Sequence, residues 1–518
     1  MKNKLFLKGA IVLIVCNLIG KILGAIYRIP LSRLLGPVGM GMYQLIFPLY
    51  TMLLTISTAG IPVAISKLVA EYNAKNEFFN SKKIFKIAVI LLTVLSFLAA
   101  TFVAIAAKFI ATMQGNSSVY VCYYAIAPAI LFVGILSAFR GYFQGNILMF
   151  PTAISSLVEQ VVKMAFGLFL AGKWLQYGVE YAVLGAIVAI SISELVAVVF
   201  LFINYLIYNR RHKVLKGKTS QSFKFLSKSI IGLSLPVTAS SIIAPITNMI
   251  DSFLVVNLLM MTGYSSAEAT SFLGLQSGVV ESLVNVPVII AVSISTVLLP
   301  NISAAQVSGS KEKVKELAEK SFQIALCISI CCSICFFIFG KQILTFLYGK
   351  SFSEDNILKA TELLFAGSFN IVILSLVQVT TAILQGINKT KIPVKSLFIG
   401  CGLKIAADCI LIPIKKINIF GVVISAAICY LFVFFRNYKF VKEYTTATIK
   451  KPIFYISIQA VSVAVFAFVS NVLCKIVLGD MLSMFVSGLV AVLVFFVVYY
   501  VFYLYENEGG LFYRLKIK

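Results

Sequence analysis

Ionisable side chains lie inside the long apolar stretches of this chain. The first stretch holds Lys21 and Arg28, which are two helical turns apart and therefore project from one helix face. Lys21 lies about 13 residues, or roughly 20 Å of helix, beyond Lys8, which places it well inside a hydrocarbon core about 30 Å thick. A cation there costs roughly 2.5–3.5 kcal/mol, so a water-filled cavity, a carboxylate or an anionic substrate must solvate it.

Later apolar stretches add candidates of both signs. Ionisable residues inside membrane spans are functional candidates by default, and here they are Glu159, Lys163, Glu194, Asp251, Glu281, Lys404 and Asp408. Two of the pairs, Glu159 with Lys163 and Lys404 with Asp408, have the i, i+4 spacing of an ion pair.

Two polar pairs share helix faces. Asn248 lies three residues before Asp251, and Glu281 lies four before Asn285. Acids that face a cavity can hold a cation or a proton, and oxygen-rich clusters suit Na⁺.

Composition decides what kind of elements carry these residues. The chain has 518 residues, of which 60% are hydrophobic and 12% charged, with a mean hydropathy of +0.99. That is enough for about fourteen spans of about 20 residues, and long uninterrupted apolar runs exclude a barrel of alternating strands. We therefore predict an all-α polytopic membrane protein. The net charge of +25 fits the positive-inside rule rather than nucleic-acid binding.

The basic residues set the topology. We predict spans near residues 8–30, 43–68, 86–111, 119–141, 152–173, 181–207, 230–257, 273–300, 321–347, 358–385, 392–414, 418–436, 453–478 and 481–505. With the N-terminus in the cytoplasm, cytoplasmic segments hold 31 Lys and Arg and the opposite side holds 10. The prediction is a multi-pass protein of the cytoplasmic membrane with both termini cytoplasmic.

An internal repeat divides the chain. Gln144-Gly145 after the fourth span matches Gln385-Gly386 after the tenth, an offset of about 240 residues. Six spans is an even number, so the two copies enter the membrane in the same direction, and a substrate site is expected between them. We predict a six-helix lobe over residues 1–217, a second over 218–446, and two extra helices with a tail over 447–518.

The loop between the halves, residues 209–228, carries seven cations and the single histidine, His212. We interpret it as a topology anchor, with binding of anionic lipid headgroups as the alternative.

Enzyme chemistry has no support. Gly36, Gly39 and Gly41 lack the strand and the Lys-Ser/Thr of a phosphate loop, and they indicate a tight interhelical turn. There is no zinc spacing and no Ser/His/Asp set. Cys327, Cys331 and Cys335 share a helix face and are interpreted as packing residues. We expect no cofactor and no firm metal site.

Three segments together resemble a known family: Lys21 through Arg28 to LSRLLGPVGMGMYQ, then GIPVAISKLVAEYNAKN, then FRGYFQGNILMFPTAISSLVEQVVK. They are similar to the stage V sporulation protein B branch of the polysaccharide-export flippases, in the multidrug/oligosaccharidyl-lipid/polysaccharide (MOP) superfamily, near the MurJ-type lipid II flippases.

The resemblance implies two six-helix lobes forming a V, with alternating access. The implied cargo is an undecaprenyl-pyrophosphate-linked sugar such as lipid II, and the last two spans would add a groove for its lipid tail. Lys21 and Arg28 match basic positions of the family's first helix, where both would meet the pyrophosphate.

The chain departs from the family in two places. Arginines that lipid II flippases carry in helices two and eight are missing. Gln44 stands among the polar residues of span two, and Glu281 with Asn285 stands in span eight. Some relatives bind Na⁺ through carboxylates on helices seven and eleven, which correspond to Asp251, beside Asn248, and Asp408. Lys404 lies one turn before Asp408 and can supply that cation itself, which argues against a sodium site there. The candidates for the driving force are Na⁺, H⁺ and the membrane potential.

The leading hypothesis is a monomeric flippase whose partners are the lipid-linked sugar, membrane lipids and cell-wall synthesis enzymes, with no nucleic acid. The alternatives are a multidrug cation antiporter of the same superfamily and a non-transport scaffold for wall synthesis.

Overall fold

The computed structural model describes residues 2–211 and 221–508, and every regular element among them is a helix. Residues 212–220 of the predicted basic loop, which include His212, lie outside the described residues. The all-helical membrane fold is confirmed. The chain divides into two compact units, Met1–Gly278 and Val279–Lys518.

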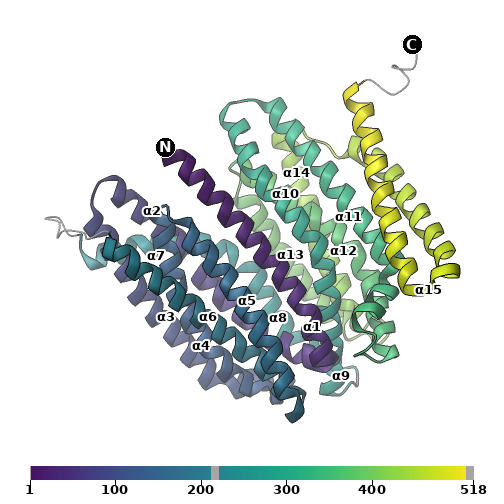
Figure 1. Cartoon of the computed structure of the whole chain (residues 1–518), viewed down its shortest axis with the longest axis horizontal. Coiled ribbons are helices and arrows are strands. Elements are labelled where there is room, and N and C mark those ends of the chain that lie inside the picture. The colour runs from purple at the N-terminus through teal and green to yellow at the C-terminus, as the bar shows by residue number, and fades with distance from the viewer. Residues whose placement is uncertain (1, 212–220, 509–518) are drawn as a thin grey trace. The chain divides into compact units, whose positions relative to one another are not determined.

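The first unit contains nine helices and two short 3₁₀ turns among its described residues (Figure 1). The helices are α1 (Lys2–Thr58), α2 (Ile61–Ala74), α3 (Phe78–Met113), α4 (Tyr120–Gly145), α5 (Met149–Trp174), α6 (Val179–Arg211), α7 (Phe223–Ser241), α8 (Ile243–Met260) and α9 (Ser266–Leu273). A π-helical segment, η3 (Gly274–Val280), leads into the second unit.

The glycine turn predicted after the first span is a sharp kink inside α1. At 1.5 Å per residue, a straight helix of 57 residues would be about 85 Å long, far more than a bilayer needs. Gly36 breaks it, with φ 67° and ψ −179°, a conformation that side chains rarely adopt, and Pro37 follows. The residues before the kink carry Lys21 and Arg28, and those after it carry Gln44.

Aromatic packing holds the body of the first unit together. The Phe85 ring of α3 lies 5.1 Å from Phe139 and 4.6 Å from Tyr142, both on α4, and 4.8 Å from Tyr205 of α6. Such pairs contribute roughly 0.5–1.5 kcal/mol each beyond the area that they bury.

The main chains of α1 and α9 approach each other very closely. A Cβ added to Gly41 would lie 1.8 Å from the Thr270 carbonyl oxygen, and one added to Gly274 would lie 1.9 Å from that of Pro37. Only glycine fits at either position, so the main chain of α1 packs directly against α9 and against Gly274, the first residue of η3.

Hydrogen bonds extend this contact to the turn between α3 and α4. Asn257 donates to the Met113 carbonyl at 2.7 Å, and Ser266 donates to that of Gly115 at 2.6 Å. Helices α7 to α9 therefore pack with α1, α2 and α3 in one unit, although the sequence repeat assigns them to the second lobe. The predicted lobe boundaries stay a prediction.

The second unit contains six helices among its described residues: α10 (Glu281–Val307), α11 (Lys311–Tyr348), α12 (Glu354–Gly386), α13 (Lys391–Leu411), α14 (Phe420–Thr445) and α15 (Lys450–Glu508). Helix α12 packs against α10, α11 and α14. Helix α15 folds back on itself (Figure 1). The Gln459 side chain donates a hydrogen bond to the Phe495 carbonyl at 3.1 Å, although Phe495 lies 36 residues further along the chain.

Eleven helices of the described residues are long and apolar enough to cross a membrane. The predicted number of fourteen spans is not confirmed, because some predicted spans merge and another is broken in the structure. The first two predicted spans merge across the Gly36 kink, and the seventh is broken near Ile242 into α7 and α8.

A buried ion pair within α13 is hydrogen-bonded to a serine of α14. Lys404 Nζ lies 2.9 Å from Asp408 Oδ2, and the Ser425 hydroxyl of α14 donates to Asp408 Oδ1. Asp408 is fully buried, and the Lys404 side chain is 10% exposed. The i, i+4 spacing predicted this pair, and the serine supplies a donor that the sequence did not reveal.

We predict that Gly41→Ala destabilises the protein by about 1–3 kcal/mol, because its methyl group has to displace the α9 main chain. Thermal unfolding of the purified protein measures the change. Gly232→Ala on α7 is the matched control, since a Cβ there meets nothing within 4 Å. An equal effect of the two substitutions would contradict the close approach.

We predict that Lys404→Met destabilises the protein by about 3–5 kcal/mol, because it leaves the Asp408 carboxylate buried without its cation. Adding Asp408→Asn should restore most of this loss, since the double variant buries no net charge. Thermal unfolding of both variants checks the pairing. A double variant no more stable than Lys404→Met would refute it.

Candidate functional site

Lys21 is a cation on an apolar helix with no partner of opposite charge. Its side chain is exposed, and none of the salt bridges among the described residues includes it. Its neighbours Ile19 and Ile22 are 42% and 44% exposed, so this part of α1 faces out of the protein interior. A charge in such surroundings is free to contact an anion from outside the chain.

Arg28 lies two turns further along the same helix and is held in place. Its guanidinium carbon lies 5.6 Å from the centroid of the Phe47 ring, beyond the kink. The Phe47 ring in turn stacks on Tyr43 at 5.3 Å. A guanidinium over an aromatic face keeps its positive charge, and a positive charge attracts an oxyanion.

A cluster of charged side chains lies in the same unit. Arg140 of α4 forms a salt bridge at 2.9 Å with Glu159 of α5, and the Ser155 hydroxyl accepts a hydrogen bond from Arg140 Nε at 3.2 Å. The i, i+4 spacing had paired Glu159 with Lys163, but the described residues form no such salt bridge. Lys163 still interacts electrostatically with Glu159, and also with Glu194 and Arg28.

Arg140 is a residue that the sequence reasoning missed as a site member. It stands at the end of the fourth predicted span, residues 119–141, and is not among the ionisable candidates that the sequence indicates inside the spans. Its position in FRGYFQG, directly after a long apolar run, was the only available signal.

Gln44 serves the fold in this conformation. Its side chain is 7% exposed, and Nε2 donates to the Ser277 carbonyl of η3 at 2.6 Å. Gln44 thus joins α1 to the main chain of the π-helical segment through a side-chain hydrogen bond. Its predicted contact with substrate stays a prediction.

The other predicted residues divide between the units. Asn248 and Asp251 lie one turn apart on α8 in the first unit, Asn248 exposed and Asp251 half-buried. Glu281 and Asn285 lie one turn apart on α10 in the second unit, Glu281 exposed and Asn285 half-buried.

Metal ligation finds no cluster to support it. Within residues 2–211 and 221–508, no three His, Cys, Asp or Glu side chains gather as a metal site. Lys404 and Asp408 of α13, predicted as ion-coupling residues, contact each other. The cysteines are free thiols, and Cys327 contacts Gln459 of α15 at 2.6 Å.

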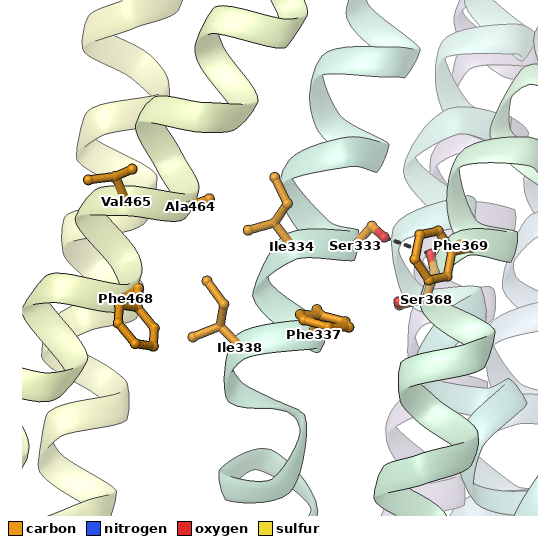
Figure 2. A pocket seen from close by; sticks show the side chains of 9 residues that line it. All are labelled: Ser333, Ile334, Phe337, Ile338, Ser368, Phe369, Ala464, Val465 and Phe468. Atoms are coloured by element: carbon orange, nitrogen blue, oxygen red, sulfur yellow. Dashed lines mark hydrogen bonds between the residues drawn. The ribbon is translucent and has the colours of Figure 1, made fainter.

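An apolar groove of about 500 Å³ lies in the second unit between α11, α12 and α15. Figure 2 shows its walls, where Ile334 and Ile338 of α11 point toward Ala464, Val465 and Phe468 of α15. The Phe337 ring of α11 lies on the side of α12, near Ser368 and Phe369. Its polar edge is a hydrogen bond from the Ser333 hydroxyl to the Ser368 carbonyl at 2.8 Å. A groove of this kind suits a hydrocarbon chain.

The chain matches two protein families and several known bacterial proteins. Residues 6–306 match the polysaccharide biosynthesis protein family, and residues 236–410 match the MatE family. Lipid II flippase MurJ of Bacillus subtilis (strain 168) is 30% identical over 83% of this chain and 81% of its own length. Stage V sporulation protein B of the same organism is 29% identical over 68% of each chain.

Solved structures show the same fold. A lipid II flippase MurJ in an inward closed conformation matches with a TM-score of 0.74 and 16% identity, over 95% of this chain and 99% of that one. An inward-facing multidrug resistance MATE family transporter of the MOP superfamily matches with a TM-score of 0.64 and 15% identity, over 83% and 96%. The polysaccharide biosynthesis match covers more than half of the chain, so the chain belongs to the polysaccharide biosynthesis protein family.

Proposed function

We propose that this protein is a flippase that moves a lipid-linked precursor across the cytoplasmic membrane. Its cargo is an undecaprenyl-pyrophosphate-linked cell-wall precursor, lipid II or a related glycolipid, and it works by alternating access of two six-helix lobes. The proposal is supported by 30% identity to a lipid II flippase over most of both chains.

The observation that carries the proposal is the pair of cations on α1. Lys21 has no partner of opposite charge among the described residues, and Arg28 is fixed over Phe47 two turns away. A pyrophosphate concentrates negative charge and accepts several hydrogen bonds at once, which matches an ammonium and a guanidinium on one helix face. No acid is needed to solvate Lys21 if the cargo supplies the charge.

The groove supports the lipid half of the cargo. Its walls are branched and aromatic side chains of α11 and α15, and it holds about 500 Å³. A polyprenyl chain is apolar along its whole length, so part of it can lie in the groove while the rest remains among membrane lipids. This assigns a role to α15, which lies outside the six-helix repeat.

The chain's charges disfavour a multidrug cation antiporter. An organic cation would meet Lys21 and Arg28 on α1, and like charges repel strongly where water is scarce. Efflux of a cationic dye by reconstituted protein would favour that alternative.

Coupling to sodium is not required at Asp408. The Lys404 ammonium already lies 2.9 Å from that carboxylate, inside the protein. The membrane potential supplies about 2.3 kcal/mol for each charge moved through 100 mV, which is enough to drive a transport cycle. Both termini lie in the cytoplasm in this proposal.

We predict that Lys21→Ala slows translocation of labelled lipid II in proteoliposomes by roughly 10- to 100-fold, the worth of one charge-assisted hydrogen bond of about 1.5–3 kcal/mol. Lys21→Arg should retain most of the rate because it keeps the charge. Lys173→Ala, at an exposed lysine near the end of α5, is the control and should leave the rate unchanged. Full activity of Lys21→Ala would exclude α1 as the pyrophosphate site.

We predict that Ala464→Trp, which fills the groove, weakens binding of undecaprenyl pyrophosphate at least about tenfold while binding of short-chain farnesyl pyrophosphate stays unchanged. Titration calorimetry measures both affinities. Leu473→Trp changes a 60% exposed position of the same helix outside the groove and should behave as the unmodified protein. A parallel loss of both ligands in Ala464→Trp would count against a lipid groove.

A further inference from the structure

Glu194 of α6 is a buried acid that the proposed cargo site does not use. Its side chain is 1% exposed, inside the first unit. The Tyr50 hydroxyl of α1 donates to Oε1 at 2.7 Å. The other oxygen, Oε2, is buried and receives no hydrogen bond from any described residue.

This geometry suits the protonated acid. An ionised carboxylate accepts about four hydrogen bonds, and leaving one of its oxygens buried without a donor carries a large desolvation cost. A neutral carboxylic acid has no net charge to solvate, so a single tyrosine donor and one buried oxygen are a far smaller penalty. Buried acids of this kind inside helical bundles mark proton relays in pumps and transporters.

Ionisable groups of three neighbouring helices, α1, α4 and α5, face Glu194. Arg140 of α4 and the α5 residues Glu159 and Lys163 act on it electrostatically, and Tyr50 faces it from α1. Arg140 and Glu159 form a salt bridge with each other. Lys163 is therefore the cation left to respond to Glu194, and Lys163 also interacts with Arg28.

Protonation of Glu194 changes the charge that an anion meets. Arg28, Arg140 and Lys163 carry three positive charges and Glu159 one negative, so this group has a net charge of +2 when Glu194 is protonated and +1 when it is ionised. The protonated state is the one that attracts an anion more strongly. By linkage, an anion bound at Arg28 must equally favour protonation of Glu194.

We propose that Glu194 is a proton-binding site that links proton uptake to binding of the anionic headgroup on α1. The proton enters with the anion and leaves when the anion leaves, so the cargo's charge is partly balanced during the cycle. The link to the headgroup rests on the proposed function, while proton binding by Glu194 can be tested without any cargo.

The first experiment is infrared spectroscopy of the purified full-length protein in lipid nanodiscs, titrated between about pH 5 and pH 9. A protonated carboxylic acid band that disappears as pH rises is expected in the unmodified protein. It should be lost in Glu194→Gln and shifted in frequency in Tyr50→Phe, which keeps the acid but removes its hydrogen bond. Glu180→Gln, at an exposed acid of the same helix, should leave the band unchanged. A titration without this band, or a band that survives Glu194→Gln, overturns the proton site.

The second experiment measures the Kd for undecaprenyl pyrophosphate over the same pH range. As the pH rises and Glu194 loses its proton, the unmodified protein and Glu180→Gln should lose affinity by up to about tenfold per pH unit. This loss is counted after the pH dependence that comes from titration of the ligand itself is subtracted. Glu194→Gln, which mimics the protonated acid, should bind tightly with only the ligand's pH dependence. Equal slopes in Glu194→Gln and the unmodified protein overturn the link. If the unmodified protein does not bind this lipid at all, the cargo proposal and the link both fail, and the infrared titration alone decides the proton site.

Discussion

A charge inside an apolar bundle must find a partner, and this constraint explains most of the polar structure described here. Asp408 forms a salt bridge with Lys404 and accepts a hydrogen bond from Ser425, and Glu159 forms a salt bridge with Arg140. Each of these groups is satisfied within its own unit, and the bonds to Ser425 and Arg140 each link two neighbouring helices. Lys21 has no such partner among the described residues, which separates it from the structural charges and makes it the candidate for contact with a cargo.

The sequence predicted the helical membrane class and several local features, because these depend on residues close together in the chain. Apolar runs indicated the spans, and the glycines after Arg28 indicated the turn that the structure shows as the Gly36 kink. The i, i+4 spacing paired Lys404 with Asp408 correctly. The family resemblance, carried by motifs of the first third of the chain, is confirmed by the matches to known proteins.

The remaining features depend on contacts between distant residues. Spacing alone paired Glu159 with Lys163, but Arg140 on another helix forms the salt bridge, and no local pattern reports which helices will be neighbours. The contact of Gly41 with the Thr270 main chain joins segments more than two hundred residues apart. The hydrogen bond from Gln44 to Ser277 of the π-helical segment likewise joins residues far apart in the chain. Glu194 was visible as a candidate, yet only the structure shows its tyrosine donor and its unmatched oxygen.

The ion pair on α13 has a consequence for how this protein responds to its medium. A free cation at a carboxylate is governed by mass action, so its occupancy falls when the surrounding solution is diluted. The Lys404 ammonium is covalently attached one helical turn from Asp408, and its effective concentration there is set by the helix. The entropy of bringing the two charges together is lost once, during folding, and is not lost again in each round of binding. This part of the molecule is therefore buffered against changes in the salt content of the cell and its surroundings.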